Sequence, residues 1–211
     1  MQPVVHVVDD DPSFRKAAMR LLRAANYEVR GYASATELLD SDPNTEPGCI
    51  LLDVRMPKTS GLDLQQSLAR LEERLPIIFL TGYGDIPATV RAMKAGAVDF
   101  LTKPVRRETL LAAVQNALAI NAEERKSRAG LRGLQDLYNA LTPREREVFA
   151  HLIGGKLNKQ IAFDLSTSVR TIKAHRASVM KKLCVQSVAE LVHCAQKLGI
   201  QPIDCQTLLL H

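Results

Sequence analysis

Hydrophobic and polar residues follow two alternating patterns through the first 120 residues of the chain. Short apolar runs predict β-strands, and the stretches between them carry apolar residues at the three- and four-residue spacing of helices. Strands that alternate with helices predict a parallel sheet covered on both faces, because each parallel connection must cross back over the sheet. The predicted strands lie at 4–8, 28–32, 49–52, 77–80 and 99–101.

A different pattern begins at Thr142, beyond which every periodic segment has helical spacing. Thr142 is a predicted N-cap, Pro143 suits the first helical position, and Glu145 completes the signature of a capping box. Ser168 is predicted to cap a later helix. This part of the chain is therefore predicted to be all-α. Its further helices are predicted at 158–165, 169–183 and 187–198.

Between these patterns, residues 121–140 are polar with few apolar anchors and are predicted to be a linker. Two interpretations stay open, a short amphipathic connector or a helix that continues from the first domain and helps two chains pair. Gly130 and Gly133 weaken a continuous helix there. Four apolar residues recur at helical spacing within or next to this stretch: Leu131, Leu134, Tyr138 and Leu141.

The pattern thus divides the chain into a domain at 1–120, a linker at 121–140, a second domain at 141–198 and a tail at 199–211, to which we assign no role. Charge differs between the domains. Residues 1–120 carry 14 Lys and Arg against 15 Asp and Glu, whereas residues 142–198 carry 10 against 4. Only the second domain is therefore predicted to bind a polyanion.

No apolar run approaches the length of a membrane span, and the N-terminus lacks the features of a signal peptide. We therefore expect a cytoplasmic protein without membrane contact. The spacing of the four cysteines does not predict a zinc site, and idle thiols are expected.

Reactive side chains stand at the predicted ends of the strands of the first domain. The carboxyl ends of parallel strands meet at one edge, where ligands bind. Carboxylates placed side by side repel, and a hard cation such as Mg²⁺ together with an ammonium would offset that repulsion. One carboxylate is then free to accept a phosphoryl group, a transfer that depends on positioning and charge neutralisation. The side chains are Asp9, Asp10, Asp53, Thr81 and Lys103.

Two features next to these side chains are also predicted from the sequence. Asp11 precedes Pro12 and is predicted to cap the first helix. A cis peptide bond between Lys103 and Pro104 would turn Lys103 into the pocket.

The segments "VVDDD", "LLDVRMPKTSG", "LTGYGD" and "KAGAVDFLTKP" occur in the order and spacing of the receiver domain of two-component response regulators, which residues 4–120 resemble. The resemblance implies a flavodoxin-like (CheY-like) five-stranded sheet and phosphorylation by a sensor histidine kinase. It implies that Asp53 is the phosphoacceptor and that Phe100 is a switch aromatic that moves with Thr81. Thr81 and Lys103 would bind phosphoryl oxygens. Mg²⁺ would be held by Asp9, Asp10, Asp53 and the backbone carbonyl of Arg55.

The helix predicted at 169–183 presents basic and small residues on one face. Such a face can enter the major groove of DNA, and the positive charge of the domain favours this over a merely solvated surface. The opposite face is apolar and includes Ile172 and Val179. The basic and small residues are Arg170, Lys173, Ala174, Ala177 and Lys181.

Residues 141 to about 196 resemble the LuxR-type helix-turn-helix, most strongly in "NKQIA", "SVRTIKAHR" and "VMKKL". With the receiver, they resemble the FixJ/NarL group of transcription regulators. The resemblance implies binding to double-stranded promoter DNA, a homodimer on phosphorylation and RNA polymerase as a further partner. It implies contacts to bases from Lys173, Ala174 and Ala177, and to phosphates from Arg170, Thr171, His175 and Arg176.

Two positions depart from the LuxR-type pattern. Ser166 and Thr167 stand where the family has Gly and an aliphatic residue, and Cys184 stands where the family favours Gly. If Cys184 needs a positive φ, it costs about 1 kcal/mol.

The sequence therefore predicts a DNA-binding regulator, not an enzyme. One alternative is a regulator whose receiver is controlled by a ligand or by redox chemistry instead of phosphorylation. A second is a haloacid-dehalogenase-like phosphatase that uses Asp53. That family needs another Asp two positions after its nucleophile, where this chain has Arg55.

Overall fold

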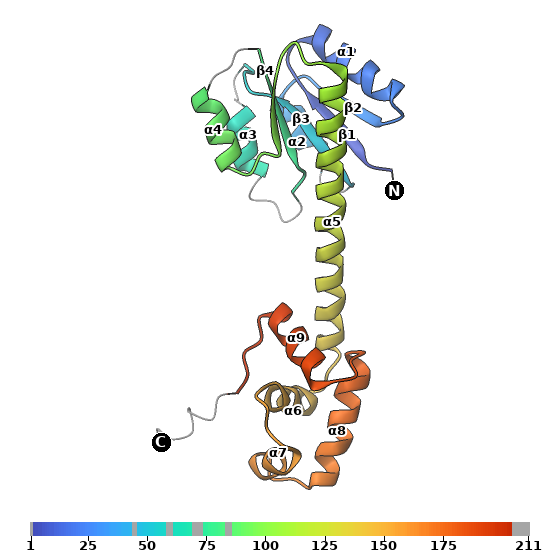
Figure 1. Ribbon diagram of the computed structural model, residues 1–211, viewed down its shortest axis with the longest axis vertical. Coiled ribbons are helices and arrows are strands. Elements are labelled where there is room, and N and C mark those ends of the chain that lie inside the picture. Colours follow the sequence, from blue (N-terminus) through green and yellow to red (C-terminus); the bar gives the residue numbers. More distant parts are fainter. Residues whose placement is uncertain (1, 44–45, 58–60, 69–73, 83–85, 204–211) are drawn as a thin grey trace. The chain divides into compact units, whose positions relative to one another are not determined.

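A computed structural model describes residues 2–43, 46–57, 61–68, 74–82 and 86–203 of the chain (Figure 1). It divides into two compact units, Met1–Arg125 and Lys126–His211. Residues 204–211 of the predicted tail, which include Cys205, lie outside the described residues. Among the described helices, none is long and apolar enough to cross a membrane.

The first unit is built on a parallel sheet with the strand order β2-β1-β3-β4-β5, which confirms the predicted flavodoxin-like receiver fold. The central strand β3 is buried along its whole length, as expected for a strand covered on both faces. The strands are β1 (Val4–Val8), β2 (Glu28–Tyr32), β3 (Gly48–Asp53), β4 (Ile77–Thr81) and β5 (Asp99–Thr102).

Helices cover both faces of this sheet (Figure 1). Helices α1 (Pro12–Ala24) and α5 (Arg107–Asn139) pack on one face, where Val5 and Val7 of β1 point. Val8 points to the other face, which is covered by α2 (Ala35–Asp40), α3 (Gly61–Leu68) and α4 (Ile86–Lys94). This alternation along β1 follows from the period of two in a strand, and each fully buried Val or Leu contributes about 1.5–3 kcal/mol.

Local hydrogen bonds determine where the chain turns after β1. The Asp11 carboxylate accepts a hydrogen bond from the Ser13 backbone N–H at 2.8 Å, so Asp11 is the N-cap of α1, as predicted. The backbone N–H of Asp11 donates to Asp9 Oδ1 at 3.0 Å. These bonds begin α1 immediately after the strand and leave Asp9 and Asp10 at the carboxyl edge of the sheet.

Helix α5 continues from the receiver through residues 121–139, which the sequence assigned to the linker. It includes Gly130 and Gly133, whose helix propensity is poor. Near its start, Leu110 and Val114 belong to the receiver core. Near its end, Tyr138 packs edge-on against Phe149, with 5.3 Å between the ring centroids.

The second unit packs α6 (Pro143–Ile153), α7 (Asn158–Asp164), α8 (Val169–Lys182) and α9 (Val188–Leu198) around one apolar core. The capping box of Thr142 and Glu145 forms at the start of α6, and Ser168 caps α8, both as predicted. The fully buried side chains include Val148, Phe149, Ile161, Ile172, Val179 and Leu191.

Two residues of this unit adopt the left-handed conformation at the positions where the LuxR-type pattern favours glycine. Ser166 has φ 48° in the turn between α7 and α8, and Cys184 has φ 54° after α8. Each side chain costs about 1 kcal/mol relative to an unstrained conformation. Cys184 therefore meets the condition under which the sequence predicts a cost at this position.

Candidate functional site

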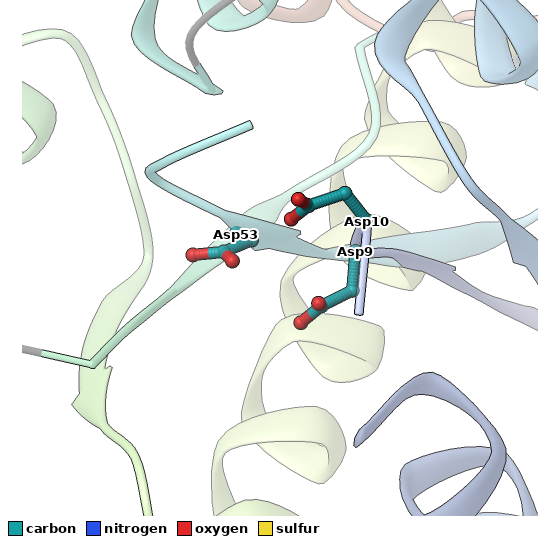
Figure 2. A group of neighbouring side chains, drawn as sticks. All are labelled: Asp9, Asp10 and Asp53. Carbon is teal, nitrogen blue, oxygen red and sulfur yellow. The ribbon is translucent and has the colours of Figure 1, made fainter. Parts of the chain in front are cut away.

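Three carboxylates gather at the carboxyl edge of the receiver sheet (Figure 2). Asp9 and Asp10 follow β1, and Asp53 ends the adjacent strand β3, whose Leu52 pairs with Val8. One oxygen of each carboxylate lies within 4.8 Å of the others. Asp9 and Asp53 are buried, whereas Asp10 is exposed. Three carboxylates at this spacing, one of them open to solvent, are a donor set that fits a small hard cation such as Mg²⁺.

Lys103 bridges two of these carboxylates and supplies the positive charge that their proximity requires. Its Nζ lies 2.5 Å from Asp9 Oδ2 and 3.0 Å from Asp53 Oδ2. Lys103 follows β5, its backbone N–H donates to the Thr81 carbonyl at 2.6 Å, and the Lys103–Pro104 peptide bond is cis. The side chain of Lys103 is 16% exposed, so water screens this ion pair weakly.

Burial and the contact between Asp9 and Lys103 shift the pKa values of both groups. Burial raises the pKa of the Asp9 carboxyl, and the hydrogen bond from Lys103 opposes that shift. Burial alone would lower the pKa of the Lys103 ammonium, but its hydrogen bonds and charge interactions with Asp9 and Asp53 outweigh burial and raise it. Lys103 therefore remains an ammonium beside these carboxylates.

Thr81 and Phe100 lie on the two strands beyond Asp53. Asp53 pairs with Leu80, so Thr81 stands one position further along β4 at the same edge, and its side chain is fully buried. Phe100 of β5 is half-buried and packs against Phe79, with 6.1 Å between the ring centroids. Two residues predicted to act together are therefore on neighbouring strands.

Gly61, the last residue of the "LLDVRMPKTSG" segment, permits a close approach between α3 and β3. A Cβ at this position would lie 2.4 Å from the backbone oxygen of Asp53. Only glycine fits without displacing the backbone that carries the central carboxylate. The backbone N–H of Arg55 donates to Asp53 Oδ1 at 3.3 Å, which further holds the loop that the metal site is predicted to share.

The structure also places two residues at this site that the sequence did not single out. The Lys103 ammonium lies 4.2 Å from the centroid of the Phe14 ring, and the Arg15 guanidinium donates to the backbone carbonyl of Asp9. In the sequence, Phe14 is one more apolar residue of the helix that Asp11 is predicted to cap. Its place in the first turn after an acidic strand end is the signal that could have identified it.

Helix α8 presents the predicted DNA-binding face to solvent. Ile172 and Val179 are fully buried on the opposite side, which fixes the rotation of the helix. His175 and Arg176 are half-buried. The exposed residues of the predicted set are Arg170, Thr171, Lys173, Ala174 and Ala177.

Glu145 ties α8 to α6 in a way that its capping-box role did not predict. Its carboxylate accepts hydrogen bonds from Ser178 Oγ at 2.5 Å and from Lys182 Nζ at 2.6 Å, in addition to the Thr142 backbone N–H at 2.7 Å. Lys182 first, then Ser178 and Thr142, lower the pKa of this buried carboxyl to about 2. These hydrogen bonds from Ser178 and Lys182 therefore hold α8, which carries the predicted DNA-binding face, against α6.

In comparisons with known proteins, each of the two units matches a protein family. Residues 5–115 match the family "Response regulator receiver domain", and residues 139–195 match "Bacterial regulatory proteins, luxR family". The response regulator protein TmoT of Ectopseudomonas mendocina is 43% identical over 197 residues, which cover 93% of this chain and 90% of TmoT. The transcriptional regulatory protein FixJ of Azorhizobium caulinodans is 39% identical over 203 residues, 96% of either chain. Among solved structures, response regulator StyR is similar with a TM-score of 0.84 and 45% identity, over 93% of this chain and all of StyR.

Proposed function

The chain belongs to the response regulators that join a receiver domain to a LuxR-type DNA-binding domain, and from this premise we propose that phosphorylation of Asp53 switches its DNA binding. As a member it is a two-component transcription regulator and not a phosphatase. One observation carries the proposal, namely that Lys103 joins the carboxylates of Asp9 and Asp53 at the open edge of the sheet.

Asp53 is the proposed nucleophile toward a phosphohistidine on a sensor histidine kinase. Its carboxylate oxygen forms a bond to phosphorus while the phosphorus–nitrogen bond breaks, and the imidazole leaves with the electron pair and takes up a proton. Lys103 and the Thr81 hydroxyl would bind the phosphoryl oxygens. Asp9, Asp10, Asp53 and the Arg55 carbonyl would hold Mg²⁺, which when bound neutralises charge on those oxygens.

The proposed switch passes from Thr81 to Phe100 and then to the α4–β5 face. We expect the Thr81 hydroxyl to move toward the phosphoryl group and the Phe100 ring to rotate with it. Helix α4 exposes Val90 and Met93, each 46% exposed, beside the basic residues Arg91 and Lys94. Two receivers are proposed to pair through this face, since exposed apolar side chains next to one another favour association.

DNA recognition is proposed to use the exposed face of α8. Lys173, Ala174 and Ala177 would face base edges in the major groove. Phosphate contacts are proposed for Arg170, Thr171, His175 and Arg176. A dimer would place two such helices on two half-sites of a promoter, where the regulator is expected to act on RNA polymerase.

A redox-controlled receiver is the less supported alternative. Cys49 is the cysteine of the receiver, it is fully buried in β3, and burial raises the pKa of its thiol to about 12. A protonated, buried thiol is a poor target for oxidants. The carboxylates of Asp9, Asp10 and Asp53, together with the Lys103 ammonium beside them, support control by phosphorylation instead.

Mass analysis of the intact protein after incubation with a small phosphodonor and Mg²⁺ tests the proposed acceptor. We expect one added phosphoryl group on the wild-type protein and none on Asp53→Asn.

Asp10→Asn should weaken Mg²⁺ binding in calorimetry, because one hard ligand is lost. Unaltered Mg²⁺ affinity in Asp10→Asn would contradict the assigned metal site.

Sedimentation velocity tests the proposed pairing. Wild-type protein should shift from monomer to dimer on addition of phosphodonor and Mg²⁺, whereas Val90→Asp should be phosphorylated but stay monomeric. Leu39→Asp is a matched control, because Leu39 is a similarly exposed hydrophobic side chain on α2, away from α4 and β5. A wild-type protein that stays monomeric at micromolar concentration would overturn the pairing.

A further inference from the structure

We infer that Phe14 is a positioning residue for Lys103, whose ammonium its aromatic ring holds in the pocket during phosphoryl transfer. This inference rests on the proposed function and deepens it. The observation behind it is the distance of 4.2 Å between Lys103 Nζ and the centroid of the Phe14 ring. At that distance the ammonium is attracted by the negative face of the ring.

The ring is held in place by its surroundings. Phe14 is half-buried and packs against the core cluster shared by α1, α5 and the sheet. Its neighbours anchor the first turn of α1 to the end of β1, because Asp11 caps the helix and Arg15 donates to the backbone carbonyl of Asp9. The ring is therefore fixed with respect to the strand end that carries the carboxylates.

Lys103 needs such support because its anionic partners change during the reaction. Before transfer, Nζ contacts oxygens of Asp9 and Asp53. Once Asp53 carries the phosphoryl group, Lys103 must turn to a phosphoryl oxygen. A lysine side chain is long and flexible, and an ion pair alone leaves it free to follow whichever anion moves. The attraction of the ring does not depend on which oxygen the ammonium faces. It therefore keeps the positive charge of Lys103 in the pocket, where that charge stabilises the phosphoryl oxygens during transfer.

Replacement of the ring should therefore slow phosphorylation without unfolding the receiver. Phe14→Leu keeps an apolar side chain in the core but removes the aromatic face, and we expect phosphorylation to become about three- to tenfold slower. Phe14→Tyr retains the ring face and should restore a rate close to that of the wild-type protein. Tyr27→Leu is a matched control, because Tyr27 is an aromatic residue packed against the same core cluster and shows no ring contact with Lys103 in the described structure.

A graded series separates electrostatic attraction from packing. Phenylalanine with one, two or three ring fluorines at position 14 has nearly the same shape but a progressively weaker negative face. The phosphorylation rate should fall stepwise with the number of fluorines. A merely structural ring would give a flat series.

Nuclear magnetic resonance gives a readout that does not depend on phosphorylation. Protons on the Lys103 side chain next to Nζ should be shifted upfield by the ring in the wild-type protein and in Phe14→Tyr, and this shift should vanish in Phe14→Leu. Absence of the shift in the wild-type protein overturns the inferred contact.

The outcomes for the two proposals are distinct. If the wild-type protein takes up no phosphoryl group, the proposed function fails, and the inferred role of Phe14 fails with it. If the wild-type protein reacts and Phe14→Leu reacts equally fast, or if the fluorinated series is flat, the proposed function stands and the inference about Phe14 is wrong.

Discussion

Acid should destabilise the receiver through His6, a histidine in the middle of β1. His6 is fully buried, its Nδ1 lies 3.1 Å from the Tyr32 hydroxyl oxygen, and the two rings stack with 5.7 Å between centroids. In the described structure its Nε2 has no hydrogen-bond partner. Burial, followed by the positive charge of Arg30, lowers the pKa of His6 from 6.5 to about 4.

The sign and size of the effect follow from linkage. Because the pKa is lower in the folded state, the unfolded chain binds more protons as the pH falls below 6.5, and the free energy of unfolding falls with it. Between about pH 7.5 and about pH 5 the loss amounts to about 2 kcal/mol, and it approaches about 3 kcal/mol once the folded state also takes up the proton.

Urea unfolding of the full-length protein across this pH range measures the loss. In His6→Leu, most of this fall in the free energy of unfolding should disappear. Tyr32 would keep its hydrogen bond from Ser41 Oγ at 3.2 Å in that variant. His193→Gln is a control, because His193 is exposed on α9. If His6→Leu and the wild-type protein lose the same free energy of unfolding between about pH 7.5 and about pH 5, the reasoning about His6 is wrong.

Further predictions concern the second unit. Glu145→Ala should lower the free energy of unfolding by about 2 kcal/mol, because Ser178, Thr142 and Lys182 lose their acceptor, whereas Glu145→Gln should lose less; equal stability in urea would contradict this role. Cys184→Gly should raise the melting temperature by a few degrees, since the exposed Cys184 has φ 54° and glycine relieves about 0.5–1 kcal/mol; a lower melting temperature would refute the strain. Arg176→Ala should weaken binding to cognate and scrambled DNA alike and reduce the salt slope by about one unit, as a phosphate contact does. Lys173→Ala should cost about 1–3 kcal/mol on the cognate duplex alone, and an equal loss on both duplexes would make Lys173 a backbone contact.

The sequence predicted the sheet because parallel strands buried on both faces read as uninterrupted apolar runs. It also predicted that Asp9, Asp10, Asp53 and Lys103 meet, because they follow strands whose carboxyl ends share one edge. Their chemical roles stay predictions. Helix α2 was not located, since its six residues are too few for a clear helical period.

Other features depend on contacts between segments that no local pattern reveals. His6 sits inside an apolar run and gave no sign that its Nε2 would be buried without a partner. Glu145 fits a capping box, and only the packing of α6 on α8 brings Lys182 to its carboxylate. The contact between Phe14 and Lys103 joins residues that are 89 positions apart, so only the folded arrangement could reveal it.

Fluorescence anisotropy with a labelled cognate promoter duplex tests the central claim most directly. Wild-type protein and Asp53→Asn are compared at fixed salt, each before and after addition of phosphodonor and Mg²⁺. We expect the wild-type protein to bind the duplex more tightly after phosphodonor, whereas Asp53→Asn keeps one affinity throughout. If phosphodonor leaves the affinity of the wild-type protein unchanged, or strengthens Asp53→Asn equally, phosphorylation of Asp53 does not control DNA binding by this regulator.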